Sequence, residues 1–117
     1  MNALVCNKNE KPWGCFYVTH DSSISKSKLI VVDQGNSISY QYHRMRSEDW
    51  IVLGGKGIVT IEGDSFEVEC GAHVRIEKGQ KHRIRCTEGP LTFVEVQTGE
   101  YFGEDDIVRL EDEYGRI

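Results

Sequence analysis

The chain has 117 residues, of which 38% are hydrophobic and 28% are charged, so it fits one domain (1–117) with a modest core. Its 14 basic and 19 acidic residues give a net charge of −5, which excludes the basic surface that sequence-independent nucleic-acid binding needs. No apolar run is long enough to cross a membrane, and no signal peptide is visible at the start, so we expect a cytoplasmic protein that binds no membrane.

The start of the chain differs from its middle. Residues 1–11 are polar apart from Leu4 and Val5. We expect 1–10 to form a loose arm, or else an edge strand.

The middle of the chain is organised in short segments with a period of two. Each segment is rich in Val, Ile, Tyr, Phe or Trp and is bounded by Gly, Asp, Asn or Ser, which predicts β-strands. The predicted strands are 16–19, 28–32, 38–42, 50–53, 58–61, 66–68, 82–85 and 91–97. Gly63-Asp64 predicts a tight hairpin between two of them. No segment of ten or more residues has a helical period, so we predict an all-β sandwich or small barrel.

The end of the chain, 103–117, is acidic but also carries apolar residues. Ile107, Val108 and Leu110 favour a tail that packs on the barrel with a charged outer face over a free interaction tail.

The four cysteines stand far apart, with no C-x-x-C pair. This spacing argues against a four-cysteine zinc site and favours reduced thiols. Two disulfides in a secreted domain are the alternative.

Four polar residues lie on strand faces that also carry apolar side chains. Side chains alternate along a strand, so Gln41 and His43 share one face. Glu48 and His82 lie on the same faces as neighbouring apolar residues. Burying these groups is costly unless they satisfy one another, and one bound cation satisfies all four. Two imidazoles and two oxygens suit one divalent ion, Zn²⁺, Mn²⁺, Fe²⁺, Co²⁺ or Ni²⁺, and do not distinguish among them.

The spacing of these residues resembles the two motifs of the cupin superfamily, G(x)5HxH(x)4E(x)6G and G(x)5PxG(x)2H. The first motif is matched by Gly35, Gln41, His43, Glu48 and Gly55, and the second by Gly71, Glu77, Gly79 and His82. Gln41 stands where the first histidine is usual, and Glu77 stands where the proline is usual. The resemblance implies a single jelly-roll β-barrel of the cupin type, with Gln41, His43, Glu48 and His82 as metal ligands.

Flanking segments narrow the resemblance. Lys11-Pro-Trp-Gly14, Lys81-His-Arg83 and the tail from Glu95 to Arg116 resemble the cupin domain of type II mannose-6-phosphate isomerases. That domain usually forms the C-terminal part of a bifunctional enzyme with mannose-1-phosphate guanylyltransferase. The resemblance implies a metal-dependent interconversion of mannose 6-phosphate and fructose 6-phosphate. The nucleotidyltransferase half has no counterpart in this sequence, so we expect a cupin domain that stands alone.

The chain departs from the family inside one cluster. The family usually reads H-H-H-R-x-E-H-W, whereas this chain has His43-Arg-Met-Arg-Ser-Glu-Asp-Trp50. Arg44, Met45 and Asp49 therefore replace three histidines that proton transfer or substrate contact can use. Metal binding is less affected by these replacements than catalysis.

The remaining site residues follow from the chemistry of aldose–ketose exchange. A guanidinium binds phosphate through two parallel hydrogen bonds, and the candidates are Arg46 and Arg109, which lie in the family segments. A general base must reach the proton that leaves C2. Asp49, Glu95 or a metal-bound hydroxide are the candidates, and Glu95 shares a face with Phe93 and Gln97.

Two other functions stay open. The lost histidines favour a non-catalytic module that binds a sugar phosphate or nucleotide sugar, or that docks on a separate guanylyltransferase. Another metal chemistry, such as dioxygen activation, is the third possible function.

We also expect a homodimer, because exposed sheet edges favour pairing with a second copy of the chain.

Overall fold

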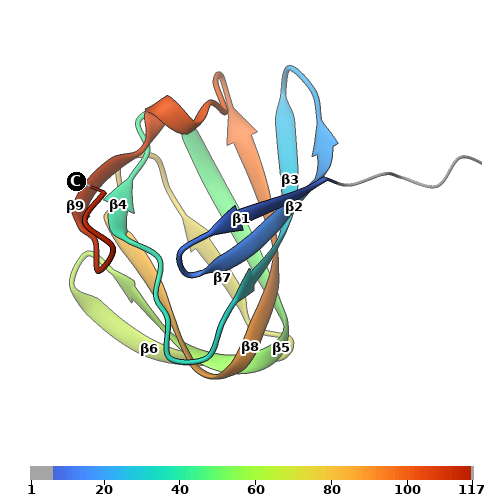
Figure 1. Ribbon diagram of the computed structural model, residues 1–117. Coiled ribbons are helices and arrows are strands. Elements are labelled where there is room, and N and C mark those ends of the chain that lie inside the picture. Colours follow the sequence, from blue (N-terminus) through green and yellow to red (C-terminus); the bar gives the residue numbers. More distant parts are fainter. Residues whose placement is uncertain (1–6, 117) are drawn as a thin grey trace, which may run out of the picture.

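The computed structural model describes residues 7–116, which form a curled sheet of nine strands and one short 3₁₀ turn (Figure 1). The predicted all-β jelly-roll barrel is confirmed. The elements are β1 (Lys8–Lys11), β2 (Gly14–Asp21), β3 (Ser25–Val32), β4 (Tyr40–Tyr42), β5 (Arg46–Ile61), β6 (Asp64–Glu69), β7 (His73–Ile76), β8 (His82–Gly99), η1 (Glu104–Asp106) and β9 (Val108–Glu111). Within residues 7–116 no helix is long and apolar enough to span a membrane.

Two long strands, β5 and β8, build both walls of the barrel. The first half of β5 pairs antiparallel with the second half of β8, so that Glu48 lies opposite Gln97. The second half of β5 pairs with the first half of β8, so that Ile61 lies opposite His82. The second half of β8 also pairs with β3, and the first half contacts β4. Both ends of β8 therefore reach the same end of the barrel, although they are far apart in sequence.

Each long strand bends where sequence analysis predicted a break between two strands. Register shifts between Val52 and Gly57 mark the bend of β5. Gly55 adopts φ +77°, and a Cβ there would lie 2.4 Å from the Pro90 carbonyl oxygen. Glycine is required by both the left-handed backbone and the close approach. The glycines thus bend the ladder without ending it, which explains why four predicted short strands form two long ones.

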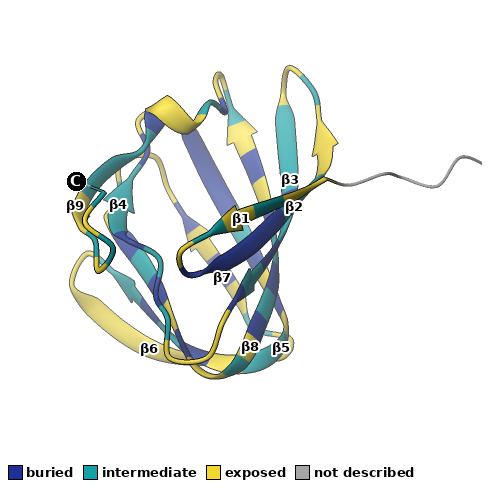
Figure 2. Cartoon of the chain, viewed as in Figure 1, coloured by how far each residue is buried: buried dark blue, intermediate teal, exposed yellow. Residues whose placement is uncertain are grey.

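The apolar core fills the end of the barrel next to these bends, which we call the bend end, and extends to Trp50 and Phe93 toward the other end. Its side chains alternate with outward ones along β5 and β8 (Figure 2). Its fully buried members at the bend end include Val32, Val52, Val59, Ile84, Cys86 and Leu91. Burial of such residues supplies most of the stability of a small barrel.

The predicted strands 16–19, 28–32 and 66–68 lie within β2, β3 and β6, and β4 forms only the last three residues of the predicted strand 38–42. β1 agrees with the edge-strand alternative for the start of the chain. β7 and β9 were not predicted, because segments of four residues are too short to show a period of two. The predicted tight hairpin forms one residue earlier than expected, with positive φ at Glu62 and Gly63. Two successive positive φ angles match the twist of a two-residue hairpin.

The two ends of the described chain both pair with the sheet. β1 is an edge strand on β2, while residues 1–6 of the expected arm lie outside the described residues. In the tail, η1 and β9 lie against β4 (Figure 1). Cys15, Cys70 and Cys86 carry free thiols, and Cys6 lies outside the described residues.

Candidate metal centre

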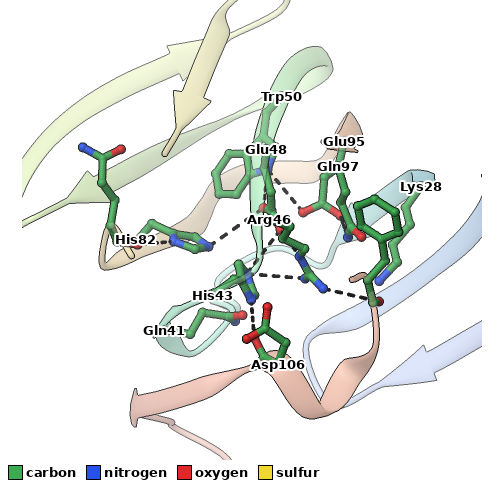
Figure 3. Close-up of polar contacts among 12 residues, drawn as sticks. Lys28, Gln41, His43, Arg46, Glu48, Trp50, His82, Glu95, Gln97 and Asp106 are labelled. Carbon is green, nitrogen blue, oxygen red and sulfur yellow. Dashed lines mark hydrogen bonds and ion pairs between the residues drawn. The ribbon is translucent and has the colours of Figure 1, made fainter. Parts of the chain in front are cut away.

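Three of the four predicted ligands meet inside the barrel, at the end opposite the bends, which we call the cavity end. His43 follows β4, Glu48 lies on β5 and His82 begins β8. One ligand atom from each lies within 4.8 Å of the other two. All three side chains are at most 3% exposed. Figure 3 shows them pointing toward one another from these different elements.

Backbone carbonyls fix how the two imidazoles are oriented. Nδ1 of His43 lies 2.9 Å from the Asp106 carbonyl oxygen, and Nδ1 of His82 lies 2.9 Å from that of Gln80. A carbonyl oxygen only accepts, so each Nδ1 carries the hydrogen, and in the neutral ring the lone pair is on Nε2. The Nε2 atoms lie 3.2 and 3.9 Å from the Glu48 carboxylate oxygens.

This donor set fits a divalent cation. Two imidazole lone pairs that face a buried carboxylate disfavour one another unless a positive charge lies among them. Nitrogen and oxygen ligands bind Zn²⁺ at about 2 Å, which brings separate ligand atoms as close together as they are here. Hydrogen bonds from the other ring nitrogen to carbonyls are typical of metal-ligating histidines.

The environment sets the protonation of the cluster. Burial lowers the pKa of His82, which favours the neutral ring that a metal needs. Burial alone would raise the pKa of Glu48, but its contacts with His43 and Glu95, together with the nearby His82, hold the pKa well below its usual range. The Trp50 indole Nε1 donates to Glu48 Oε1 at 3.0 Å, which fixes the carboxylate in position. The ligands are thus held in the form that binds cations.

Gln41, the fourth predicted ligand, lies beside this cluster on β4. It is opposite His82 in the register and lines the same cavity. Its amide nitrogen donates to Ser39 Oγ at 2.9 Å, which leaves the amide oxygen as the atom available to a cation.

The cavity has a volume of about 70 Å³ and opens to solvent. The cluster, aromatic side chains and cationic side chains line it together. Its lining includes Trp13, Phe16, Trp50 and Phe93 as aromatic residues, and Lys11, Lys28, Arg46, Arg109 and Arg116 as cationic ones.

The two predicted general bases lie on opposite sides of the barrel wall. Glu95 lines the cavity, where its carboxylate accepts hydrogen bonds from Trp50 and Gln97. Asp49 follows Glu48 on β5, so alternation turns it outward, where it is bonded to His73 and Arg75. Asp49 does not reach the cavity, and its prediction as a general base is not supported.

The two predicted phosphate-binding arginines also differ. Arg109 lines the cavity, and its Nε is buried without a hydrogen-bond partner among residues 7–116. Arg46 is 3% exposed and donates from Nε to Glu48 Oε2 at 3.0 Å. The Arg46 guanidinium is occupied by contacts with Glu48, His43 and the Phe102 carbonyl, so it is not free to bind a phosphate.

Sequence reasoning missed two contributors. Lys28 is 5% exposed and faces the cavity, and its position two residues before Ile30 on an alternating strand is the signal that could have found it. Asp106 orients His43 through its carbonyl, and its carboxylate accepts from the backbone N–H groups of Arg44 and Met45. No local sequence pattern predicts the contact between Asp106 and His43, because it joins residues more than sixty positions apart.

Comparison with known proteins identifies the family of the chain. The family described as "Mannose-6-phosphate isomerase C-terminal" matches residues 2–112. A mannose-1-phosphate guanylyltransferase of Escherichia coli is 38% identical over 110 residues, which cover 91% of this chain and 23% of that protein. The chain therefore spans about a quarter of the length of this curated relative.

Solved structures agree on the fold. The capsular polysaccharide assembling protein CapF of Staphylococcus aureus aligns with a TM-score of 0.76 at 18% identity, over 93% of this chain and 35% of that one. An uncharacterised protein of Klebsiella pneumoniae with a double-stranded β-helix domain aligns with a TM-score of 0.71 at 20% identity, over 82% and 83%. At these identities the likeness concerns the barrel alone.

Proposed function

The chain belongs to the mannose-6-phosphate isomerase C-terminal family, and on that premise we propose that it is a metal-dependent isomerase of mannose 6-phosphate and fructose 6-phosphate. The observation that carries the proposal is the buried cluster of His43, Glu48 and His82 at the wall of a cavity that is open to solvent. A divalent ion held by these residues and Gln41 would supply a Lewis acid for two adjacent sugar oxygens.

Glu95 is the proposed general base. Aldose–ketose exchange moves a proton between C2 and C1 through an enediol, so a base must lie in the cavity. Burial, followed by the charge of Glu48, raises the pKa of Glu95 to about 8, so that it holds its proton at neutral pH and becomes, as the pH approaches 8, a stronger base than an exposed glutamate. Hydrogen bonds from Trp50 and Gln97 hold both of its oxygens in place.

The cationic side chains that line the cavity are the proposed site for the sugar phosphate. The Arg109 Nε hydrogen has no partner among residues 7–116, and a phosphate oxygen accepts such a donor well. Lys28 Nζ is buried, 3.4 Å from Glu104 Oε1 and 4.3 Å from the centre of the Phe16 ring. A buried ammonium with one distant anionic partner retains donors for a substrate oxygen.

The replaced family histidines weaken this proposal less than the sequence suggested. Arg44 and Met45 are exposed, and Asp49 faces outward toward Arg75. None of these three residues lines the cavity. Their replacement removes no group from the candidate reaction site, which favours catalysis over the non-catalytic module.

A coupled assay with mannose 6-phosphate tests the proposal. We expect turnover with added Mn²⁺, Zn²⁺ or Co²⁺, loss of turnover with a chelator, and recovery when metal is restored. His82→Ala should abolish turnover, and His73→Ala, which removes an exposed histidine, is the matched control. No turnover with any metal, together with tight binding to a guanylyltransferase, would favour the docking module instead.

A further inference from the structure

Arg46 places a positive charge inside the candidate metal centre. Its side chain is 3% exposed, an unusual location for an arginine. Nε donates to Glu48 Oε2 at 3.0 Å, and one terminal nitrogen lies 3.4 Å from His43 Nε2 (Figure 3). The other terminal nitrogen lies 3.5 Å from the Phe102 carbonyl oxygen. The guanidinium therefore contacts acceptor atoms of two metal-ligand residues.

We propose that Arg46 is an internal cation that competes with the metal and weakens its binding. A guanidinium at these acceptors satisfies the buried Glu48 carboxylate when no metal is present. A divalent ion in the same cluster lies within a few ångströms of that positive charge, in a buried site where repulsion is poorly screened. Arg46 thereby makes the metal exchangeable and stabilises the metal-free fold. The inference rests on the metal-binding part of the proposed function and not on the isomerase reaction.

The ligands do not depend on Arg46 for their positions. Trp50 Nε1 donates to the other Glu48 oxygen at 3.0 Å. The two imidazoles are held by the carbonyls of Asp106 and Gln80. Removal of the guanidinium should therefore leave the three ligands in place and free one carboxylate oxygen. This separates competition from a positioning role, in which loss of Arg46 would disorder Glu48.

Zinc and cobalt titrations of the chelator-treated protein test the proposal. Arg46→Met removes the charge and keeps most of the volume, and it should tighten the dissociation constant for Zn²⁺ by about tenfold or more. Arg46→Lys keeps the charge and should stay close to the wild type. Arg75→Met is the matched control, because it removes one charge from an exposed arginine paired with Asp49 and Glu77.

Thermal melting gives a readout that does not involve activity. Metal-free Arg46→Met should melt below the wild type, because Glu48 loses its buried counter-charge. Saturating Zn²⁺ should raise its melting temperature more than that of the wild type. If the methionine variant does not fold without metal, Arg46→Gln gives the same comparison with a polar side chain.

The outcomes separate the two proposals. Tighter binding in Arg46→Met, including binding where the wild type shows none, supports competition. Unchanged or weaker binding in Arg46→Met, with normal binding by the wild type, overturns the role of Arg46 and leaves the metal site intact. Absence of Zn²⁺ and Co²⁺ binding in every variant overturns both.

Discussion

The bend end and the cavity end of the barrel are built from the same strands and are buried to the same depth, but their chemistry differs. Leu91 and Ile84 are fully buried at the bend end, and Glu48 and His82 are 1% exposed at the cavity end. All four side chains point inward by the same alternation along β5 and β8. The position in the barrel, and not the depth of burial, separates core from site.

The two ends of the barrel contribute differently to the stability of the fold. Apolar burial at the bend end is favourable by itself. Buried charge at the cavity end is unfavourable unless it is neutralised, and the residues there are arranged to neutralise it. Buried charged residues that are kept despite this cost are candidates for a functional role, so the cavity end is the candidate functional site.

The largest expected effect comes from the cavity end. Glu95→Gln removes the proposed base and should lower turnover by about 10² to 10⁴-fold. Because the ligands His43, Glu48 and His82 are unchanged, Zn²⁺ binding should persist. Steady-state rates with mannose 6-phosphate and a zinc titration of the same sample check this. Wild-type rates in the variant would remove Glu95 from the mechanism.

The bend end should respond in stability and not in chemistry. Leu91→Ala leaves a cavity in the core and should lower the free energy of unfolding by about 2–5 kcal/mol. The folded fraction should bind Zn²⁺ with unchanged affinity. Urea denaturation and a titration below the transition measure the two quantities. A large loss of affinity would mean that the two ends are not independent.

The pH dependence of stability tests the buried charge directly. The pKa of Glu95 is raised to about 8, so the folded state keeps a proton there that the unfolded chain releases. Stability of the metal-free protein should therefore fall as pH rises toward 8. The pKa of His82 is lowered from its ordinary value, so its own contribution lies below about pH 6.5.

Glu95→Gln isolates that contribution. Between pH 6.5 and 8 the wild type should lose about 2 kcal/mol relative to the variant. Denaturant unfolding of both proteins at several pH values in this window measures the difference. A constant difference across the window would show that Glu95 is ionised in the fold at neutral pH.

The smallest expected effect lies on the outside of the wall. Asp49 is next to Glu48 in sequence but is bonded to His73 and Arg75 on the partly exposed outer face. Asp49→Ala should change stability by less than about 1 kcal/mol and leave zinc affinity and turnover near the wild-type values. The same titration and rate measurement apply. A turnover loss comparable to that of Glu95→Gln would restore Asp49 as a candidate base.

The sequence predicted the barrel and the convergence of His43, Glu48 and His82 because both depend on local alternation and spacing. Gln41, His43 and Glu48 lie within eight residues, and the inward face of each strand was readable. The bends of β5 and β8 could not be predicted from the sequence, because Gly55 and Gly89 resemble the ends of strands unless the facing strand is known. Strand continuity is a property of pairing and not of one segment.

The roles of individual residues were assigned less well. Arg46 was predicted to hold phosphate, although its partners His43 and Glu48 are only three and two residues away, and alternation already places it on the inward face of Glu48. Lys28 and Asp106 joined the site through contacts that span much of the chain. Asp49 needed only the alternation rule to be placed outside, since Glu48 was already assigned to the interior.

The most direct test is elemental analysis of the purified protein alongside His43→Ala, His82→Ala and the surface control His73→Ala. We expect one equivalent of a divalent metal in the wild type and in His73→Ala after reconstitution, and almost none in the other two variants. Folding of each variant is checked by circular dichroism. Full metal content in folded His43→Ala or His82→Ala would contradict the claim that these side chains converge on a single ion.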